Sequence, residues 1–384
     1  MRRVLYITGT RADYGLMRST LKAIDARDDL ELIVVVTGMH LMQEFGGTAS
    51  EVEKDGFRTI LVPTKFESDS RSAAPRFLGA FIQQLTDVVD RERPDEILLL
   101  GDRAEMLAGA IVGSYIGIPT FHVHGGDVSS TVDEHVRHAI TKLSHHHLAA
   151  TPRSAERIKM MGEEPWRIHT VGSPSLDGID KVGRVSTEEL VTLGLGEHEK
   201  YLMLGQHPVS DEALLSAEQI GGTIDALIED GRRTLVVYPN ADAGGRRMIE
   251  VIEKRCKPPQ FILFKNLPRD RYLRLLSGAS ALVGNSSSGL VEAPSLGVPF
   301  VNVGTRQKGR ERGENVIDVG YGKKEVLRGL DEIKRPGALE RTRRCRNPYG
   351  DGHTGERIAR LLSEMDLSPR TTQKTLSYTF IDGS

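Results

Sequence analysis

Hydrophobic positions along the chain follow two alternating patterns. Short and continuously apolar runs, such as Leu32–Val36 and Ile97–Leu100, are typical of strands that are buried on both faces of a parallel sheet. Longer stretches between these runs carry apolar residues at helical spacing, as Leu16, Leu21 and Ile24 do. The repeated alternation predicts an α/β protein whose parallel sheets are covered by helices on both faces.

The same patterns predict the order of the elements. In the first half, strands are expected at 4–8, 31–37, 96–100, 120–123, 148–151 and 169–172, with helices at 16–24, 77–89, 104–115, 133–144 and 154–161. In the second half, strands are expected at 201–204, 234–238, 261–264, 281–283 and 300–303, with helices at 212–227, 246–254, 271–276 and 353–365. A turn-rich segment separates the halves. We therefore expect a first domain at 1–172, a linker at 173–180, a second domain at 181–366 and a polar tail at 367–384.

Composition narrows the functional classes. The 384 residues suffice for two domains, and the formal net charge of −2 gives no sign of a surface for nucleic acid or anionic membranes. The two cysteines, Cys256 and Cys345, fit no metal-binding motif and agree with a reducing cytosol. The N-terminus does not read as a signal peptide, and no segment approaches the ~20 apolar residues of a membrane span. We expect a cytoplasmic protein with a small-molecule ligand.

Polar turns follow strand after strand, always on the carboxyl side. They lie at 9–15, 101–103, 122–127, 205–208, 239–244 and 284–289. Parallel α/β sheets bind ligands at the carboxyl ends of their strands. Two such domains that face each other predict a ligand-binding cleft between them.

The most informative turn is the serine-rich one that follows the strand expected at 281–283. Ser286 and Ser287 stand where a helix that extends to Gly297 is expected to begin, so that hydroxyls and free backbone N–H groups would face an anion such as phosphate. Glu292 lies about one turn further along, where it could accept hydrogen bonds from a ribose. The alternative interpretation is a serine-rich helix cap in an ordinary α/β unit.

Other turns carry groups that suit a diphosphate. Arg11 stands at a helix start, and its guanidinium could bridge phosphate oxygens. His207 follows a strand and could reach the same diphosphate, while Asn240 occupies a glycine-bounded loop in the same register. The alternatives are a surface arginine and a packed or exposed histidine.

Asp102 and Arg103 follow the buried strand at 96–100. A carboxylate at the end of a buried strand is a candidate general base, because partial desolvation raises its basicity. Asp102 could instead cap the helix expected at 104–115. Asp133 opens the helix at 133–144, where its plain role would be compensation of the helix dipole.

Histidines gather near the strand at 120–123. Alternation along that strand predicts that His122 and His124 point to the same face, and Gly125–Gly126 would let the backbone approach a ligand closely. Two histidines and scattered aspartates, including Asp127, do not supply the three converging ligands of a metal site, so no metal is expected. The run His145–His147 is interpreted as dipole compensation and packing at a helix end.

These motifs resemble those of the hydrolysing branch of the UDP-N-acetylglucosamine 2-epimerases, over roughly residues 3–362. The resemblance rests on GTRADYG at 9–15, VTGMH at 36–40, GDR at 101–103, DEHVRHAITKL at 133–143, NADAG at 240–244, GNSSSG at 284–289 and RQKGR at 306–310. Non-hydrolysing members have Pro-Glu after the arginine of the opening motif, where this chain has Ala12 and Asp13.

The resemblance implies two Rossmann-like domains in the glycosyltransferase-B arrangement, UDP held mostly by the second domain, no metal or redox cofactor, and a homodimer. It implies that Asp102 and Asp133 are catalytic carboxylates. It also implies a set of UDP-binding residues, namely Arg11, Arg103, His207, Asn240, Ser286, Ser287, Glu292 and Arg306. The family reaction eliminates UDP across sugar carbons 1 and 2 to give a glycal. Water then adds, and carbon 2 emerges inverted.

One position divides the family. Some members carry Glu where this chain has His124, and Asp127 is also Glu in many relatives. Members with His-Gly-Gly include sialic-capsule and legionaminic-acid epimerases. The preferred substrate from sequence is UDP-GlcNAc, which would give N-acetylmannosamine. The alternative is UDP-2,4-diacetamido-2,4,6-trideoxyglucose. We hypothesise that His124 handles a proton or contacts the substituent on sugar carbon 4, against a plain packing role.

Three other classes share parts of this pattern, namely a glycosyltransferase with the same two-domain arrangement, a non-hydrolysing epimerase and a nucleotide-sugar sensor without catalysis. Fold alone does not separate them. The pair Asp102 and Asp133 and the opening motif argue against them through the resemblance.

Overall fold

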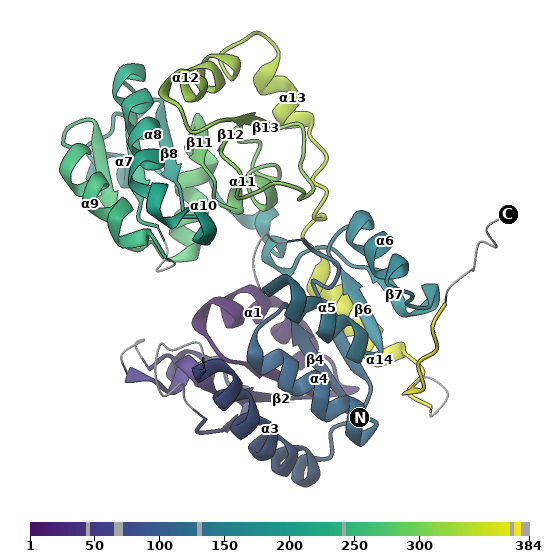
Figure 1. Ribbon diagram of the computed structural model, residues 1–384. Helices are drawn as coiled ribbons and strands as arrows, with labels where there is room; N and C mark the ends of the chain where they lie inside the picture. Colours follow the sequence, from purple (N-terminus) through teal and green to yellow (C-terminus); the bar gives the residue numbers. More distant parts are fainter. Residues whose placement is uncertain (44–46, 65–71, 129–132, 240–242, 369–371, 378–384) are drawn as a thin grey trace, which may run out of the picture. The chain divides into compact units, whose positions relative to one another are not determined.

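The computed structural model describes all residues except 44–46, 65–71, 129–132, 240–242, 369–371 and 378–384 (Figure 1). The chain forms two compact units, Met1–Asp177 together with Tyr349–Ser384, and Gly178–Pro348. It leaves the first unit between Asp177 and Gly178, within the range suggested as a linker, and returns between Pro348 and Tyr349.

The first unit is built on a parallel sheet with the strand order β3-β2-β1-β4-β5-β6-β7. The order reverses between β1 and β4, which is the point where doubly wound sheets bind their ligands. Its described elements are β1 Arg2–Thr8, α1 Arg11–Asp25, β2 Leu30–Val36, α2 Ala49–Glu53, β3 Arg58–Leu61, α3 Ala73–Glu92, β4 Glu96–Leu100, α4 Ala104–Ile116, β5 Thr120–Val123, α5 Asp133–Leu143, β6 His146–Ala149, α6 Pro152–Met160, β7 Ile168–Thr170 and α14 Thr354–Glu364.

Two apolar layers cover this sheet. Val4 and Tyr6 of β1 pack into a core with α1 and α14, whereas Leu5 and Ile7 pack on the other face with α3, α4 and α5. All four side chains are fully buried. Alternate side chains of β1 thus pack into both apolar layers, which explains why the sequence of this strand is continuously apolar.

The second unit repeats this design with a parallel sheet in the order β10-β9-β8-β11-β12-β13. Helices α8, α9 and α12 pack on one face, and the Tyr201 hydroxyl donates to the Leu275 carbonyl of α10 on the other at 2.6 Å. Its described elements are α7 Thr187–Thr192, β8 Tyr201–Gly205, α8 Ser216–Asp230, β9 Arg233–Val237, α9 Gly245–Arg255, β10 Phe261–Phe264, α10 Arg269–Gly278, β11 Ala281–Gly284, α11 Ser288–Val291, β12 Phe300–Val303, β13 Val316–Val319, α12 Lys323–Glu332 and α13 Ala338–Arg344.

The last helix belongs to the first unit, which corrects the predicted second domain at 181–366. Ile358 and Leu362 of α14 share a core with Leu21 of α1, and the two helices lie side by side in Figure 1. The Asp177 carboxylate accepts hydrogen bonds from the backbone N–H groups of Thr354 at 2.7 Å and Gly355 at 2.8 Å. Helical periodicity shows which face of α14 is apolar, but not which core receives that face.

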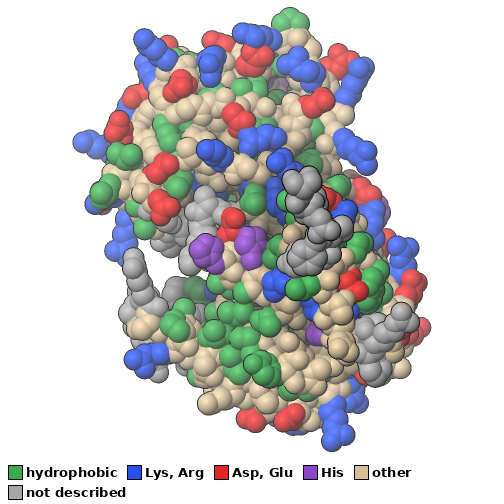
Figure 2. Space-filling model, turned by 45° about the vertical axis from the view of Figure 1, so that its right-hand side comes forward, with side chains coloured by type: hydrophobic (Ala, Val, Ile, Leu, Met, Phe, Trp, Pro, Cys, Tyr) green, Lys and Arg blue, Asp and Glu red, His purple; other side chains and the backbone are tan. Residues whose placement is uncertain are grey.

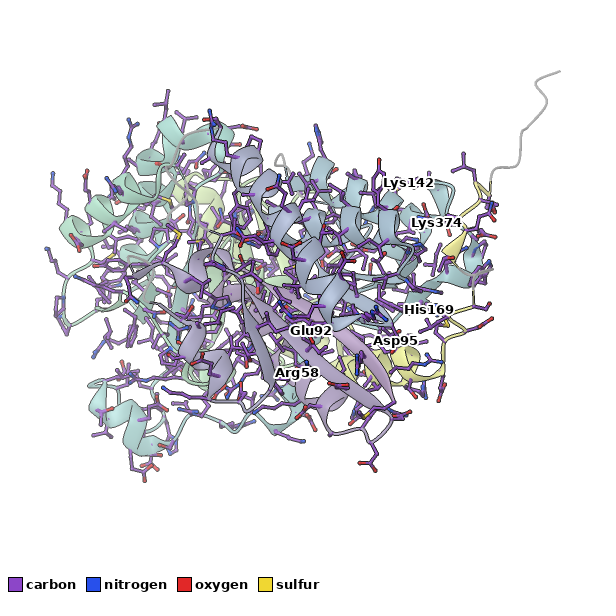
Figure 3. All side chains as sticks on the ribbon, turned by 90° about the horizontal axis from the view of Figure 1, so that it is seen from below. Arg58, Glu92, Asp95, Lys142, His169 and Lys374 are labelled. Atoms are coloured by element: carbon purple, nitrogen blue, oxygen red, sulfur yellow. The ribbon has the colours of Figure 1, made fainter. Side chains whose placement is uncertain are left out.

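The described part of the tail also packs on the first unit. Lys374 Nζ donates to the carbonyl oxygens of Lys142 at 2.8 Å and Ser144 at 2.6 Å, and it pairs with Glu163 at 2.7 Å. Lys142 also reaches Glu163, at 2.6 Å, and Lys142 and Lys374 lie close together in Figure 3. Lys374 therefore satisfies the carbonyl groups at the C-terminal end of α5. Of the two roles predicted for His145–His147, packing is confirmed, because His146 and His147 are buried in β6. Compensation of the helix dipole is wrong for these two, because burial lowers their pKa to about 3 and about 4 and keeps them neutral.

The face of the molecule drawn in Figure 2 shows no strong charge asymmetry. Lys and Arg side chains are interspersed with Asp and Glu over the face drawn in Figure 2. Among the described residues, no helix combines the length and the apolar character that a bilayer crossing requires.

Candidate active site

The turn after β1 is held by a capping box. Thr10 is the N-cap of α1, and its hydroxyl accepts from the backbone N–H of Asp13 at 3.3 Å, while Asp13 Oδ2 accepts from the backbone N–H of Thr10 at 2.9 Å. Arg11 occupies the first helical position with 57% of its side chain exposed, and its Nε lies 3.4 Å from Glu51 Oε2. The guanidinium is thus accessible to a ligand, which would replace the exposed ion pair with Glu51.

A buried polar network lies beneath this turn, and sequence reasoning missed it. The Thr8 hydroxyl donates to Asp13 and lies 3.0 Å from His40 Nε2, while His40 Nδ1 lies 2.7 Å from the Thr48 hydroxyl. Burial raises the pKa of Asp13 to about 6 and lowers the pKa of His40 to about 4. These groups share hydrogen bonds with one another, so we interpret them as the support of the turn.

Asp102 does not cap the helix behind it. The N-cap position of α4 is Arg103, whose side chain makes no capping hydrogen bond. The Asp102 carboxylate instead forms an ion pair with Arg137 of α5, with 24% of the Asp102 side chain exposed. The other guanidinium nitrogen of Arg137 donates to the Asp127 carbonyl at 2.8 Å. The geometry therefore removes the capping alternative and leaves Asp102 as a partly exposed, oriented carboxylate.

Arg103 lies beside a buried carboxylate. Its Nε is 3.4 Å from Glu105 Oε2, and Nη2 is 3.7 Å from Met39 Sδ. The Glu105 side chain is fully buried, against Gly9 and Gly38. The buried Glu105 carboxylate thus holds the Arg103 guanidinium near the ends of β1 and β4.

Asp133 is the first residue of α5, and its side chain lies outside the described part of the structure. Arg137 follows one turn later and contacts Asp102. The N-terminal half of α5 is thus tied to the end of β4, which is the neighbourhood that the predicted pair of catalytic carboxylates requires.

The two histidines near β5 do not share a face as predicted. The strand ends at Val123, and His124 adopts the left-handed region with φ = 64°, so the period-two alternation stops before it. His122 is buried, with Nε2 2.7 Å from the Gly101 carbonyl and Nδ1 3.2 Å from the Thr141 hydroxyl. Burial lowers the pKa of His122 to about 3, so this histidine is neutral. Only His124, with 21% of its side chain exposed, remains a candidate for chemistry.

The glycines after His124 serve packing. Gly126 has φ = 74°, and a Cβ atom there would collide with the Ser154 carbonyl at the start of α6. The close approach that the sequence suggested thus occurs against a helix of the same unit.

In the second unit, Asn285 links the predicted nucleotide-binding residues. Its side-chain oxygen accepts from the backbone N–H of His207 at 2.7 Å, and its amide nitrogen donates to the His207 carbonyl at 2.9 Å. The Asn285 carbonyl accepts from Arg306 Nη1 at 3.2 Å and from Gln307 Nε2 at 2.8 Å. Three strand ends are therefore joined by one buried residue, through its side chain and its backbone carbonyl, and the sequence did not single out this residue for the role.

His207 is neutral in this environment. Burial lowers its pKa to about 4, and the neighbouring Arg306 charge acts in the same direction. Of the two, only the Arg306 guanidinium brings positive charge to a bound anion, while His207 can donate or accept one hydrogen bond.

The helix after the serine-rich turn is shorter than expected. It spans only Ser288–Val291, where the sequence predicted a helix up to Gly297. Pro294 lacks a backbone N–H group and disfavours a regular helix at this point. A helix of this length contributes little dipole to the binding of an anion. Hydrogen bonds from hydroxyl groups would therefore have to supply more of the binding energy. Ser286 is partly buried and Ser287 is exposed.

Glu292 is buried beside α10, and its Oε1 lies 3.2 Å from Arg269 Nη1. Tyr272 of the same helix lies near Ser286 and Glu292, and burial raises the pKa of this tyrosine to about 12. Arg269 and Tyr272 are thus two further candidates that sequence reasoning missed, because α10 showed only its apolar spacing. Asn240 lies outside the described residues.

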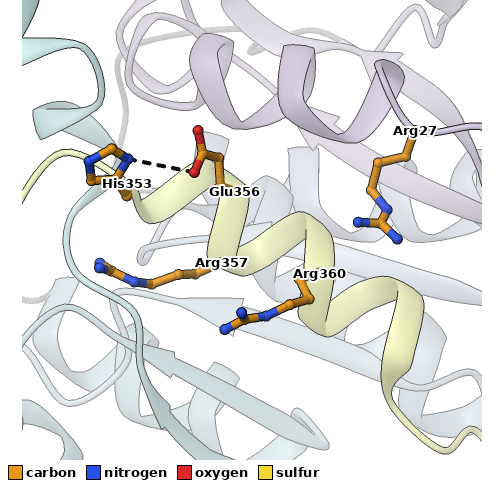
Figure 4. Close-up of a pocket in the computed structure, with 5 residues that line it drawn as sticks. All are labelled: Arg27, His353, Glu356, Arg357 and Arg360. Carbon is orange, nitrogen blue, oxygen red and sulfur yellow. Dashed lines mark ion pairs between the residues drawn. The ribbon is translucent and has the colours of Figure 1, made fainter.

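Within the described residues, no three His, Cys, Asp or Glu side chains converge as metal ligands would. A cavity of about 410 Å³ beside α14 contains none of the predicted site residues (Figure 4). Two of its arginines are engaged by carboxylates, Arg27 by Asp29 at 2.8 Å and Arg357 by Asp351 at 2.6 Å. Its basic lining is thus largely neutralised.

The two doubly wound sheets and their polar strand ends place the chain in the class of α/β proteins that bind nucleotide-linked ligands. It belongs to the UDP-N-acetylglucosamine 2-epimerase family, whose pattern matches residues 22–363. It is 39% identical over 381 residues to the UDP-N,N'-diacetylbacillosamine 2-epimerase (hydrolyzing) of Legionella pneumophila, covering 98% of this chain and 100% of that protein. It is 35% identical over 383 residues to the UDP-N-acetylglucosamine 2-epimerase of Neisseria meningitidis serogroup B, covering 100% and 99%.

Solved structures agree with this fold. The UDP-GlcNAc 2-epimerase from Neisseria meningitidis bound to UDP-GlcNAc superposes with a TM-score of 0.77 at 18% sequence identity, over 94% of this chain and 99% of that chain. The family predicted from the motifs is thereby confirmed, as is the prediction of parallel α/β domains.

Proposed function

We propose that the protein is a hydrolysing UDP-sugar 2-epimerase. A base removes the proton from sugar carbon 2, and the bond from carbon 1 to the diphosphate oxygen breaks with its electron pair leaving on UDP. Water then gives hydroxide to carbon 1 of the glycal and a proton to carbon 2 from the opposite face. The net reaction consumes one UDP-sugar and one water, and it yields UDP and a free sugar inverted at carbon 2.

The observation that carries this proposal is the network of Asp102, Arg137, Asp127 and His124 at the strand ends of the first unit. A weakly acidic carbon-bound proton needs an oriented base and a stabilised leaving group. Asp102 is oriented by Arg137 and partly exposed. We assign proton transfer to Asp102, His124 and Asp133, since Arg137 of α5 contacts both Asp102 and Asp127, the partner of His124, and Asp133 begins the same helix.

We assign the diphosphate and uridine mainly to the second unit. The Ser286 and Ser287 hydroxyls, His207 and the Arg306 guanidinium converge on the turn that Asn285 organises. Glu292 is proposed to hold the ribose, Asn240 to complete the set, and Arg11 and Arg103 of the first unit to bind phosphate oxygens. Hydrogen bonds to charged oxygens contribute about 1.5–3 kcal/mol each, so a few of them account for nucleotide binding.

For the sugar we propose UDP-N,N'-diacetylbacillosamine, which is a 2,4-diacetamido-trideoxy sugar. The Legionella relative, whose name states this activity, is more similar to this chain than the Neisseria UDP-N-acetylglucosamine 2-epimerase, with 39% against 35% identity. The sequence alone had favoured UDP-GlcNAc, with N-acetylmannosamine as product, and that substrate stays as the second candidate because its relative also covers the whole chain. We also propose that the protein is a cytoplasmic homodimer. Light scattering, which measures the molecular mass in solution, tests the dimer.

The test is incubation of the protein with each UDP-sugar in turn, followed by chromatography of nucleotide and sugar. We expect UDP and a free 2-inverted sugar from both, with the higher kcat/KM for the diacetamido substrate. A UDP-linked epimer that retains its nucleotide would contradict the hydrolysing reaction. A preference for UDP-GlcNAc would overturn the substrate assignment and leave the reaction intact.

A further inference from the structure

The side chain of His124 lies between an acid and a hydroxyl. Its Nδ1 is 2.9 Å from Asp127 Oδ2, and its Nε2 is 3.2 Å from the Ser173 hydroxyl oxygen. We propose that Asp127 and Ser173 are positioning residues, which fix the tautomer and the ring orientation of His124, and that a proton taken up at Nε2 replaces the hydrogen bond that Ser173 donates to this nitrogen. The inference rests on the proposed function, in which His124 handles a proton.

Asp127 sets the tautomer. An ionised carboxylate only accepts hydrogen bonds, so Nδ1 must carry the hydrogen and Nε2 must present its lone pair. The second oxygen of Asp127 accepts from the Ser154 hydroxyl at 2.7 Å, and its backbone carbonyl accepts from Arg137 at 2.8 Å. The carboxylate is thus held from both α6 and α5, and it would stabilise the charge of a ring that gains a proton at Nε2.

Ser173 fixes the other edge of the ring. Its hydroxyl donates to Nε2 and lies 2.9 Å from the Ser175 hydroxyl, which can donate to it in turn. The Ser173 backbone N–H donates to the Tyr349 carbonyl at 2.7 Å, which anchors the loop. The hydrogen bonds therefore run in one direction, from Ser175 through Ser173 and His124 to Asp127.

The same three residue types act as a nucleophile, base and orienting acid in acyl-transfer enzymes. Here Ser173 is only 2% exposed and its hydroxyl is also engaged by Ser175, whereas an attacking serine must reach a substrate carbon. His124, with 21% of its side chain exposed, is the more accessible member. The geometry thus favours an oriented histidine over a serine nucleophile.

The first readout is spectroscopic and independent of activity. Nitrogen NMR of protein labelled in its histidines, with the His124 signal assigned through His124→Gln, should show the Nδ1–H tautomer. Asp127→Asn should convert it to a mixture or to the Nε2–H tautomer, and Asp127→Glu should restore it. An unchanged tautomer in a folded Asp127→Asn variant would overturn the inference, whether or not the enzyme releases UDP.

The second readout is kinetic. Removing the partner that orients a metal-binding histidine costs roughly tenfold to a hundredfold, and we expect a similar factor here. Asp127→Asn should therefore lower kcat by that factor without weakening UDP binding, and Asp127→Glu should recover most of it. Ser173→Ala should give a smaller loss of kcat. Ser144→Ala, which alters another buried serine of the same unit, is the matched control and should retain activity.

The outcomes separate the two proposals. A wild-type protein that releases no UDP from either sugar contradicts the proposed function, while the tautomer measurement still decides the roles of Asp127 and Ser173. Normal turnover in Asp127→Asn together with normal wild-type activity contradicts the positioning roles alone.

Discussion

The two units share a strand order, yet their strand ends carry different chemistry. When the strands of each unit are numbered from 1 along the chain, both sheets have the order 3-2-1-4-5-6, and the sheet of the first unit has one further strand at its end. In the first unit the strand ends bear carboxylates and histidine, namely Asp13, Asp102, Asp127 and His124. In the second unit they bear hydroxyl and amide groups together with Arg306 and His207, which burial keeps neutral by lowering its pKa to about 4.

Under the proposed function, this difference assigns two tasks to one architecture. Carboxylates and imidazole can exchange protons near neutral pH, whereas hydroxyls, amides and guanidinium donate hydrogen bonds without changing charge. We therefore expect substitutions in the first unit to act on turnover and those in the second unit to act on nucleotide affinity.

The largest effect is expected for the carboxylates of the first unit. Asp102→Asn and Asp133→Asn should each lower kcat by roughly a hundredfold or more, because each removes a general acid or base. UDP affinity, measured by calorimetry, should remain. Asp25→Asn, which changes an exposed aspartate of α1, is the control and should be neutral. Near-normal turnover in either site variant would remove that residue from the chemistry.

The converse is expected in the second unit. Ser286→Ala and Ser287→Ala should each weaken UDP binding by about 1.5–3 kcal/mol, the usual cost of a lost hydrogen bond to a charged group. Turnover at saturating substrate should change less than affinity. Ser277→Ala at the end of α10 provides the control. Unchanged calorimetric affinity in both folded variants would move the phosphate site away from this turn.

His124→Glu distinguishes two roles for this histidine within the first unit. If His124 handles a proton, the pH–rate profile should shift while the ratio of rates on the two UDP-sugars is kept. If it contacts the substituent on carbon 4, the ratio should change and the profile should hold. A folded variant that alters neither would leave His124 with a packing role.

The smallest effect concerns the opposite end of the first sheet. Glu96 is buried at the start of β4, and neither of its carboxyl oxygens has a hydrogen-bond partner among the described residues. Burial raises its pKa from 4.5 to about 9. The folded state therefore holds a proton that the unfolded chain releases, so the contribution of Glu96 to stability is greatest below pH 4.5 and falls as the pH rises toward about 9.

Glu96→Gln removes this titration, so its melting temperature should decline less than that of the wild type between about pH 5 and pH 9. One kcal/mol corresponds to roughly 2–4 °C in a unit of this size. Parallel declines in calorimetric melts of the two proteins would show that Glu96 does not titrate in this range.

The sequence predicted the buried strands well because continuous apolar runs are unambiguous. The strands Glu96–Leu100, Thr120–Val123 and Phe261–Phe264 have the predicted bounds. The edge strands β3 and β13 were missed, since Arg58 and Asp318 interrupt their apolar pattern and both strands are partly exposed. Periodicity identified α14 as a helix but assigned it to the wrong unit.

Strand ends were likewise predictable, and their hydrogen-bond partners were not. The local sequence predicts that Asp102 follows a buried strand, but the pairing of Asp102 with Arg137 depends on how α5 packs. Asp127 and Ser173 are 46 residues apart in the numbering, and only the folded unit brings both to His124. Contacts between distant segments depend on tertiary packing, which local patterns do not encode.

The most direct test of the proposed reaction is turnover in heavy water with proton NMR of the product sugar. Removal of the carbon 2 proton and its replacement from solvent predict that the free sugar carries deuterium at carbon 2, together with one equivalent of UDP. A free inverted sugar that retains its original hydrogen at carbon 2, or unreacted UDP-sugar after full incubation, would contradict the account.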